Sequence, residues 1–223
     1  WLHGGGFLDT EAFLAAGRAY LKGRGAFREE RVAHADLDLT ADGVRWQDVR
    51  AETVVFCQGH RLLDNPWLDG LPLRPIKGEA LAGRAPGLPD HPVNRAGILV
   101  PLGEDAFRLG ATYAPGEADE TPTEEGRARL QEKLADLVPR WREGTVTAHR
   151  AGVRPATKDH RPLLGRCPGE PRVAVLNGLG AKGALLGPFY AGCLADHLSG
   201  GAELPPEADI RRFGEDPCAP TRP

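Results

Sequence analysis

The sequence predicts a mixed α/β protein (α+β) built from a partial Rossmann-like domain and an antiparallel-sheet domain. A nearly continuous apolar run at residues 53–57 suits a central parallel strand that is covered on both faces. A second run at 173–176 leads through a glycine turn into a long apolar segment, as in a strand followed by a helix. Between them, from about Asn65, frequent prolines break the chain into short strands, which indicates an antiparallel sheet.

The overall composition is that of a globular protein. The chain has 223 residues, of which 41% are hydrophobic and 26% are charged. Its net charge of −3 gives no reason to expect a nucleic-acid partner. No apolar run approaches the roughly 20 residues that a membrane span needs. We therefore expect neither of these partners, while the oligomeric state stays open.

The four cysteines are Cys57, Cys167, Cys193 and Cys218, and no two of them form a C-x-x-C pair. The sequence therefore predicts no zinc site and no redox dithiol. Cys57 and Cys193 lie in apolar runs and are expected to be small core residues. A reducing, cytoplasmic setting fits this cysteine usage. Since the chain contains no methionine, we expect it to be a segment of a longer protein.

The first third of the chain predicts a helix and a hairpin. Asp9 is the expected N-cap of a helix over residues 10–22, whose apolar residues recur at helical spacing. Alternation over 32–39 predicts a strand. Asp42-Gly43 is a hairpin turn signal, and 44–49 is expected to return as the partner strand.

The middle of the chain predicts a small sheet with one helix. The expected strands are 76–81, 97–102 and 107–113. Thr121 to Glu124 has the form of a capping box, with Pro122 at the first helical position. The helix that follows has one apolar stripe, Glu125 and Arg129 are placed to pair on its outside, and Pro139 ends it.

The last third predicts a strand at 145–153, a polar loop at 154–162 and a short strand at 163–165. A helix over 183–198 is apolar nearly all round and is therefore expected to be buried. The predicted domains are 1–64 with 151–213, forming one discontinuous α/β domain, then 65–150 as the antiparallel sheet with one helix, and 214–223 as an irregular tail. A chain that leaves a domain and returns to it is consistent with a ligand at the junction.

The turn at residues 177–184 is the main candidate site. Its glycines let backbone approach a ligand closely, and the first turn of the following helix presents unpaired N–H groups. Lys182 adds a positive charge, so the turn suits a phosphate or a group that becomes anionic during a reaction. A second glycine turn, 58–60, follows the strand at 53–57. The alternative is a tight strand-to-helix connection without a ligand.

An ordered set of stretches resembles the D-amino-acid oxidase-like family of flavoproteins, which includes glycine oxidase and sarcosine oxidase. These stretches are 5–9, 51–59, 99–101, 108–112, 151–165 and 177–184. The resemblance covers nearly the whole chain and corresponds to the C-terminal two-thirds of the family. It implies FAD as the cofactor, an FAD-binding role for the α/β domain and a substrate-binding role for 65–150. The family's N-terminal G-x-G-x-x-G turn is absent here, so we expect the segment alone to bind FAD poorly and to be inactive.

The resemblance also implies which residues bind the cofactor. Val32 matches a valine at the adenine end, and the turn from Cys57 to Gly59 passes near the dinucleotide. The turn at 177–184 lies along the pyrimidine edge of the flavin, where the helix start and Lys182 would stabilise negative charge on the reduced ring. The expected cofactor-binding residues are Val32, Cys57, Gly59, Gly152, Gly178, Leu179, Gly180, Ala181, Lys182, Gly183 and Ala184.

Arg154, Lys182 and Tyr113 are the expected catalytic residues. Arg154 matches the arginine that holds the substrate carboxylate in amino-acid-oxidising members, where two parallel hydrogen bonds orient the α-carbon. Some members have a tyrosine at the position of Ile98, which cannot donate a hydrogen bond, and Tyr113 on the neighbouring strand is the expected substitute. The alternatives are a loop-bracing ion pair of Arg154 with Asp159, a solvated Lys182, and a core or rim Tyr113. The resemblance implies no metal ligand.

The function implied by the resemblance is FAD-dependent oxidation of a small amine or amino acid by hydride transfer from the α-carbon to the flavin. One alternative is a flavin-dependent tRNA-modification oxidoreductase of the same family. Another is a non-catalytic, degenerate homologue that keeps the fold for assembly. A third is a nucleotide-binding protein that shares only the glycine turn. The exact substrate and the electron acceptor stay open.

Overall fold

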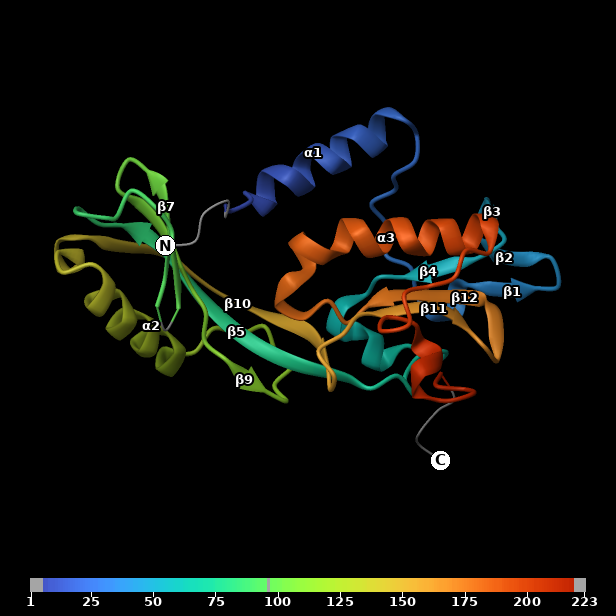
Figure 1. Cartoon of the computed structure of the whole chain (residues 1–223). Coiled ribbons are helices and arrows are strands. Elements are labelled where there is room, and N and C mark those ends of the chain that lie inside the picture. The colour runs from blue at the N-terminus through green and yellow to red at the C-terminus, as the bar shows by residue number, and fades with distance from the viewer. Residues whose placement is uncertain (1–5, 96, 219–223) are drawn as a thin grey trace. The chain divides into compact units, whose positions relative to one another are not determined.

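The computed structural model describes residues 6–95 and 97–218. They divide into two compact units (Figure 1). The first consists of Pro75–Arg154 with residues 6–8, and the second of Asp9–Arg74 with the described residues from Pro155 onward. Residues 1–5 and 219–223, which belong to the predicted ends of the chain, lie outside the described residues.

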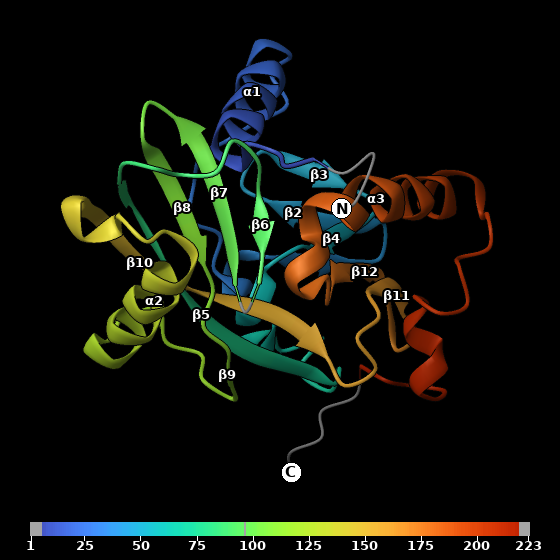
Figure 2. The same ribbon diagram turned by 60° about the vertical axis from the view of Figure 1, so that its left-hand side comes forward.

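The first unit is built on an antiparallel sheet, as the sequence predicts. Among the described residues its strand order is β10-β5-β8-β7-β6, and β9 also pairs with β5 (Figure 2). The strands are β5 (Leu73–Arg84), β6 (Val93–Asn94), β7 (Ile98–Gly103), β8 (Ala106–Gly110), β9 (Ala114–Pro115) and β10 (Thr145–Thr157). The predicted turn between β7 and β8 is confirmed, with positive φ at Gly103, Glu104 and Asp105.

Helix α2 (Glu124–Leu137) forms the core of this unit with the sheet. Its Leu130 and Leu134 are fully buried, together with Leu99 of β7 and Leu109 of β8. The predicted pairing on the outer face is also confirmed, since Arg129 Nη2 lies 2.6 Å from Glu125 Oε1. One apolar stripe, correctly spaced, is thus enough to fix which side of α2 faces the sheet.

The predicted cap of α2 is wrong by two residues. Thr123 is the N-cap, and its Oγ1 accepts a hydrogen bond from Gly126 N at 3.0 Å, while Pro122 precedes the cap. The reason is a distant carboxylate. Glu79 of β5 accepts from Thr123 N at 2.9 Å and from Thr123 Oγ1 at 2.8 Å, and this contact holds Thr123 in the cap position.

The second unit contains two three-stranded sheets in the described chain. One is a meander of β1 (Asp38–Thr40), β2 (Gly43–Trp46) and β3 (Val49–Ala51). The other has the order β11-β12-β4, where β4 is Val54–Phe56, β11 is Leu163–Cys167 and β12 is Glu170–Asn177. β12 pairs with β4 in parallel, which confirms the predicted parallel pairing of the strand at 53–57. The predicted central position is wrong, because β4 is an edge strand of this sheet in the described chain. One face of β4 is less covered than predicted, since Val55 on that face is 38% exposed.

Three predicted strand boundaries in the chain are wrong. Residues 32–39 form a strand only from Asp38, since His34–Asp36 makes a single 3-10 turn in which Asp36 Oδ2 accepts from Ala33 N at 3.3 Å. The predicted strand 44–49 divides into β2 and β3 at Gln47, whose φ is 51°. β10 continues through Thr157 into the predicted polar loop, because its backbone finds partners in β5.

Two helices of the second unit leave apolar side chains exposed. α1 (Thr10–Gly23) has the predicted Asp9 cap, and none of its residues is buried within the described chain. α3 (Gly183–Gly200) buries Tyr190 and Leu194 against the sheet, whereas Leu185 is 77% and Phe189 62% exposed. The prediction that α3 is buried all round is therefore wrong for this face. An apolar surface needs a covering element, and none of the described residues supplies one.

Candidate functional site

The two glycine turns of the second unit meet at one end of the mixed sheet β11-β12-β4. Because β4 and β12 run in parallel, their carboxyl ends lie at the same edge. Asn177, the last residue of β12, joins the two turns. Its Nδ2 donates to Gly59 O at 2.9 Å, and its Oδ1 accepts from Gly178 N at 2.8 Å. Gly59 and Gly178 both have positive φ, at 61° and 71°.

The inner side of the second turn has no room for a side chain. A Cβ at Gly178 would lie 2.8 Å from Thr157 Cγ2 and 3.0 Å from Leu163 Cγ. At Gly180 and Gly183 the nearest atom would be 3.9 Å away, which is ordinary van der Waals contact. The turn is thus packed firmly against the protein at its first glycine and is more open at the next two.

The start of α3 follows directly on the second glycine turn. A short 3-10 turn, Gly180–Lys182, leads into the helix, and no side chain of the described residues caps it. An uncapped helix start of this kind suits an anionic ligand, at the positive end of the helix dipole. Ala181, Lys182 and Ala184 are exposed, so side chains of the turn do not plug the helix start.

The spacing of this turn carries a signal that the sequence interpretation missed. Gly178, Gly180 and Gly183 themselves have the G-x-G-x-x-G spacing, between strand β12 and helix α3. Because the spacing lies in a turn between a strand and a helix, it supports a dinucleotide-binding role for this turn. The described chain has no second parallel strand after α3, so this is a β-turn-α unit and not a complete βαβ unit.

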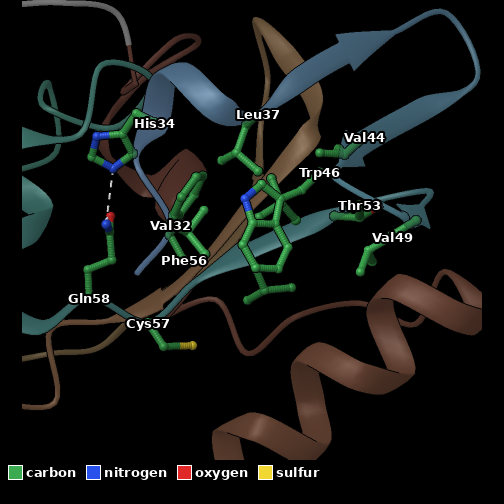
Figure 3. A pocket seen from close by; sticks show the side chains of 13 residues that line it. Val32, His34, Leu37, Val44, Trp46, Val49, Thr53, Phe56, Cys57 and Gln58 are labelled. Atoms are coloured by element: carbon green, nitrogen blue, oxygen red, sulfur yellow. Dashed lines mark hydrogen bonds between the residues drawn. The ribbon is translucent and has the colours of Figure 1, made fainter. Parts of the chain in front are cut away.

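Two of the expected cofactor residues, Val32 and Cys57, line the same cavity of about 480 Å³ (Figure 3). The other labelled side chains around it are His34, Leu37, Val44, Trp46, Val49, Thr53, Phe56 and Gln58. The buried Nε1 of Trp46 has no hydrogen-bond partner among the described residues. A buried N–H without a partner is costly, and the residue that carries it is one of those that line this largely apolar cavity.

The mouth of this cavity is held by side-chain contacts. Gln58 lies 3.0 Å from His34 Nε2, and its Oε1 accepts from Asn65 Nδ2 at 2.8 Å. The His34 ring contacts Phe56 edge-on at 5.8 Å between centroids. Cys57 is exposed, so the expectation of a small core cysteine is wrong at this position.

Arg154 lies in the first unit, on β10, and its guanidinium has no acidic partner among the described residues. Its Nη1 makes one long hydrogen bond, 3.5 Å, to Thr112 O. The guanidinium packs directly on Gly78, where any Cβ would overlap it. Asp159 instead pairs with Arg212, whose Nε lies 2.9 Å from Asp159 Oδ2. The alternative of an Arg154–Asp159 ion pair is therefore not what the structure shows.

Tyr113 follows directly on the residue whose carbonyl binds Arg154. It is 61% exposed, and Ile98 is 51% exposed, so both are surface residues of the first unit. β8 ends at Gly110, which places Tyr113 beyond the strand on which it was predicted. The alternative of a core tyrosine is excluded.

Gly152 lies on β10 with nothing within 4 Å of where its Cβ would be, so space alone does not require glycine there.

A buried charged cluster next to Gly78 was not foreseen from the sequence. Glu79 is 4% exposed, and its Oε2 lies 2.8 Å from His149 Nε2. Burial alone would raise the pKa of Glu79, but hydrogen bonds from Thr123 and the contact with His149 outweigh it and hold the pKa below its ordinary value. Lys77 is 2% exposed and lies 2.9 Å from Asp119 Oδ1. These contacts hold β5 in place on both sides of Gly78, the residue that packs on Arg154.

Comparisons with known proteins find similarity to glycine oxidases and to bifunctional proteins of tRNA modification. Glycine oxidase of Bacillus subtilis is 29% identical over 201 residues, which cover 80% of this chain and 52% of that protein. The tRNA 5-methylaminomethyl-2-thiouridine biosynthesis bifunctional protein of Marinobacter nauticus is 30% identical over 192 residues, covering 77% of this chain and 30% of that protein. The chain thus spans about half of the first relative's length and less of the second's.

Solved structures agree with this. Iminodiacetate oxidase from Chelativorans sp. BNC1 superimposes with a TM-score of 0.72 at 25% identity, covering 91% of this chain and 57% of that one. Glycine oxidase from Geobacillus kaustophilus gives a TM-score of 0.65 at 29% identity, covering 80% of this chain and 50% of that one.

In the part of the chain that the structure describes, no helix combines the length and the apolar character of a membrane span.

The family model described as FAD dependent oxidoreductase matches residues 1–197. The ordered motifs, the glycine turn at the end of a parallel strand and the solved relatives all agree with that match. The chain belongs to the D-amino-acid oxidase-like family of FAD-dependent oxidoreductases.

Proposed function

We propose that the whole protein oxidises a small amine or amino acid that carries a carboxylate, by hydride transfer from the α-carbon to FAD. The observation that carries the proposal is the Arg154 guanidinium, which is half-buried and has no acidic partner in the described chain. Relatives named for their substrates, glycine oxidase and iminodiacetate oxidase, act on amines that bear a carboxylate. A free, partly desolvated guanidinium suits that group.

Each part of the chain has a role in this proposal. Arg154 holds the substrate carboxylate with two parallel hydrogen bonds, while Gly78 beneath it keeps the guanidinium plane fixed. The hydroxyl of Tyr113, which follows the residue whose carbonyl accepts from Arg154, is the second donor. When bound, FAD supplies the hydride acceptor. The open start of α3 and Lys182 stabilise negative charge on the ring, and the turn at Gly178 brings backbone against it.

The residues present fit FAD on two structural grounds. The glycine turn ends in an uncapped helix start, and the cavity with Val32 and Cys57 is also lined by Trp46, whose buried N–H has no partner among the described residues. The remaining expected cofactor residues, Gly59, Leu179, Gly180, Ala181, Gly183 and Ala184, belong to the two turns and the helix start. We propose that FAD binds fully only when the family's N-terminal glycine turn is also present.

The tRNA-modifying relatives support a second candidate, because the chain is 30% identical to one of them over 77% of its length. In that case the same Arg154 and flavin site would oxidise a carboxymethylaminomethyl-type group on tRNA. The net charge of −3 gives this segment little affinity of its own for RNA. A substrate screen separates the two candidates.

The test uses the full-length protein with bound FAD. Turnover is measured with glycine, sarcosine, iminodiacetate, an amine of similar size without a carboxylate, and tRNA that carries the modified base. For Arg154→Ala we expect a KM for the carboxylate substrate that is higher by roughly 10–100-fold, the value of a charged hydrogen bond, with FAD content unchanged. Arg129→Ala, on the outer face of α2, is the matched control.

Three results decide the matter. An unchanged KM in Arg154→Ala would overturn the role of Arg154. Turnover of tRNA but of no free amine would replace the first candidate by the second. Full-length protein that binds FAD but oxidises none of these substrates would support the non-catalytic homologue.

A further inference from the structure

A cluster of three metal-ligating side chains lies in the second unit, outside the candidate site described above. It consists of Cys167 at the end of β11 and of Asp216 and Cys218 in the irregular C-terminal segment. Their two Sγ atoms and one carboxylate oxygen all lie within 4.8 Å of one another. Cys167 is 4% and Cys218 2% exposed, whereas Asp216 is exposed.

The backbone around Cys167 is arranged to present its sulfur. The register between β11 and β12 shifts between Arg166 and Cys167, and a tight turn follows through Pro168 and Gly169. The Cys167 thiol donates a hydrogen bond to Trp67 O at 3.7 Å, which fixes the position of the sulfur beside the turn.

The turn is also shaped to admit the carboxylate. A Cβ at Gly169 would lie 3.2 Å from Asp216 Oδ2, closer than an ordinary contact, so glycine lets the C-terminal segment approach the turn. The sulfur of Cys218 lies within 4.8 Å of the sulfur of Cys167. Residues distant in sequence are therefore brought together by packing that involves all three ligating groups.

The simplest alternative is that both cysteines only fill space in the apolar core, with which they cluster. Core filling explains their burial. It does not explain a carboxylate oxygen placed within 4.8 Å of two buried sulfurs. A cation satisfies all three groups at once, because it supplies the positive charge that two thiolates and a carboxylate need.

We propose that Cys167, Cys218 and Asp216 form a binding site for a soft divalent cation of the Zn²⁺ class. Two thiolates select such an ion over Mg²⁺ or Ca²⁺, and the carboxylate is its third ligand. Since Asp216 is exposed, water fills the fourth tetrahedral position from that side. Binding displaces one proton from each thiol and leaves the carboxylate ionised, so the reaction releases two protons per cation.

The position of the site indicates a structural role. The cation clips the C-terminal segment to the turn between β11 and β12. β12 starts at Glu170, next to this turn, and ends at Asn177, which joins the two glycine turns. The proposed cation thus lies at the opposite end of β12 from the candidate FAD turn and stabilises the strand without taking part in the reaction.

The test is performed on the full-length protein, purified under reducing conditions without chelator. Metal content is measured by elemental mass spectrometry. After chelation, Co²⁺ is added as the probe, because thiolate ligands give a cobalt charge-transfer band in the near ultraviolet and tetrahedral geometry gives strong visible bands. We expect one equivalent of bound cation and both sets of bands. Loss of the cation should lower the unfolding temperature, and adding Zn²⁺ back should restore it.

The variants are Cys167→Ser, Cys218→Ser and Asp216→Asn, with Cys193→Ser as the matched control. The two ligand cysteine variants should lose stoichiometric binding and the charge-transfer band. Asp216→Asn changes an exposed side chain and should leave the fold intact, yet weaken binding by at least the roughly 10–100-fold that loss of an outer-shell partner alone produces. Cys193→Ser should bind as the unaltered protein does.

Several outcomes would overturn the proposal. One is wild-type protein with both thiols free and no stoichiometric Zn²⁺ or Co²⁺ binding. Another is recovery of Cys167 and Cys218 as a disulfide from reduced preparations. Affinity that is unchanged in Asp216→Asn would remove the carboxylate from the site.

Discussion

The side-chain amide of Asn177 donates to Gly59 O at 2.9 Å, and the same amide accepts from Gly178 N at 2.8 Å. One buried residue thereby ties the ends of two parallel strands together and sets the distance between their glycine turns. Both turns are expected to contact the cofactor. Asn177 therefore controls the geometry of the candidate site without needing to touch a ligand itself.

Replacing Asn177 should affect both stability and flavin affinity. Asn177→Ala leaves Gly59 O and Gly178 N without their partner in a buried site, which costs about 1–3 kcal/mol of unfolding free energy. We also expect weaker FAD binding, because the two turns are no longer coupled. Urea denaturation and flavin titration of the full-length protein measure the two effects. Asn94→Ala, at an exposed position of β6, is the control and should change neither.

Gly178 should tolerate no side chain. Gly178→Ala places a Cβ 2.8 Å from Thr157 Cγ2 and forces a residue with a Cβ to adopt a φ of 71°. The backbone strain of about 1–2 kcal/mol adds to an overpacking cost of similar size. Gly192→Ala on α3 is the contrast, since nothing lies within 4 Å and the exchange in a helix should stabilise by about 0.5–1 kcal/mol. Equal effects in thermal unfolding would contradict the packing described for the turn.

The Glu79 cluster should make the first unit sensitive to acid. The pKa of Glu79 is lower in the folded protein than the ordinary pKa of a glutamate. The unfolded chain therefore binds this proton more readily than the folded chain. Its stabilising contribution is complete above the unfolded pKa and is lost as the pH falls through the folded pKa. Unfolding free energies at pH 7, 5, 4 and 3 should fall more steeply for the wild type than for Glu79→Gln.

The comparison with Glu79→Gln is needed because the pKa values of other carboxyl groups are also lowered in the folded protein, so these groups too make stability fall with pH. Interaction with Arg28 lowers the pKa of Asp48 to about 2, and Arg212 helps to lower the pKa of Asp159. Their effect cancels in the difference between wild type and variant. Parallel pH curves for the two proteins would show that Glu79 does not titrate as described.

Lys182 should tune the flavin if it lies at the ring as expected. Lys182→Ala removes a positive charge beside the start of α3, so an anionic adduct such as that with sulfite should bind at least about tenfold more weakly, equivalent to about 1.4 kcal/mol. The measurement is a spectrophotometric sulfite titration of the FAD-loaded full-length protein. Lys158→Ala, at an exposed position of the second unit, is the control. Identical titrations for both variants would return Lys182 to the status of a solvated surface residue.

The features that the sequence predicts well are local ones. The cap at Asp9, the Glu125–Arg129 pair and the strand-turn-helix at 177–184 depend on residues a few positions apart, and all three are found. The cap of α2 was misplaced because Glu79, 44 positions away, selects Thr123. Local helix propensity and residue spacing carry no information about a contact between residues so far apart in the sequence.

In the candidate sites, too, the local features are predictable from the sequence and the long-range contacts are not. The glycine turns are visible in the sequence, but the Asn177–Gly59 hydrogen bond that couples them depends on the parallel pairing of β4 and β12. Cys167 and Cys218 lack the short spacing by which metal sites are recognised, so only the fold reveals their proximity. The burial of α3 was overestimated, since an apolar surface does not specify what covers it.

The unequal packing of the glycine turn also sets limits for anyone who wishes to alter the protein. Gly178 is locked by its neighbours, whereas Ala181 and Lys182 face outward and can be replaced without disturbing the interior. Saturation libraries confined to these two positions would vary the electrostatic environment at the helix start while the scaffold keeps its shape. The turn thus separates, within a few residues, a position whose packing excludes a side chain from positions that directed evolution can vary.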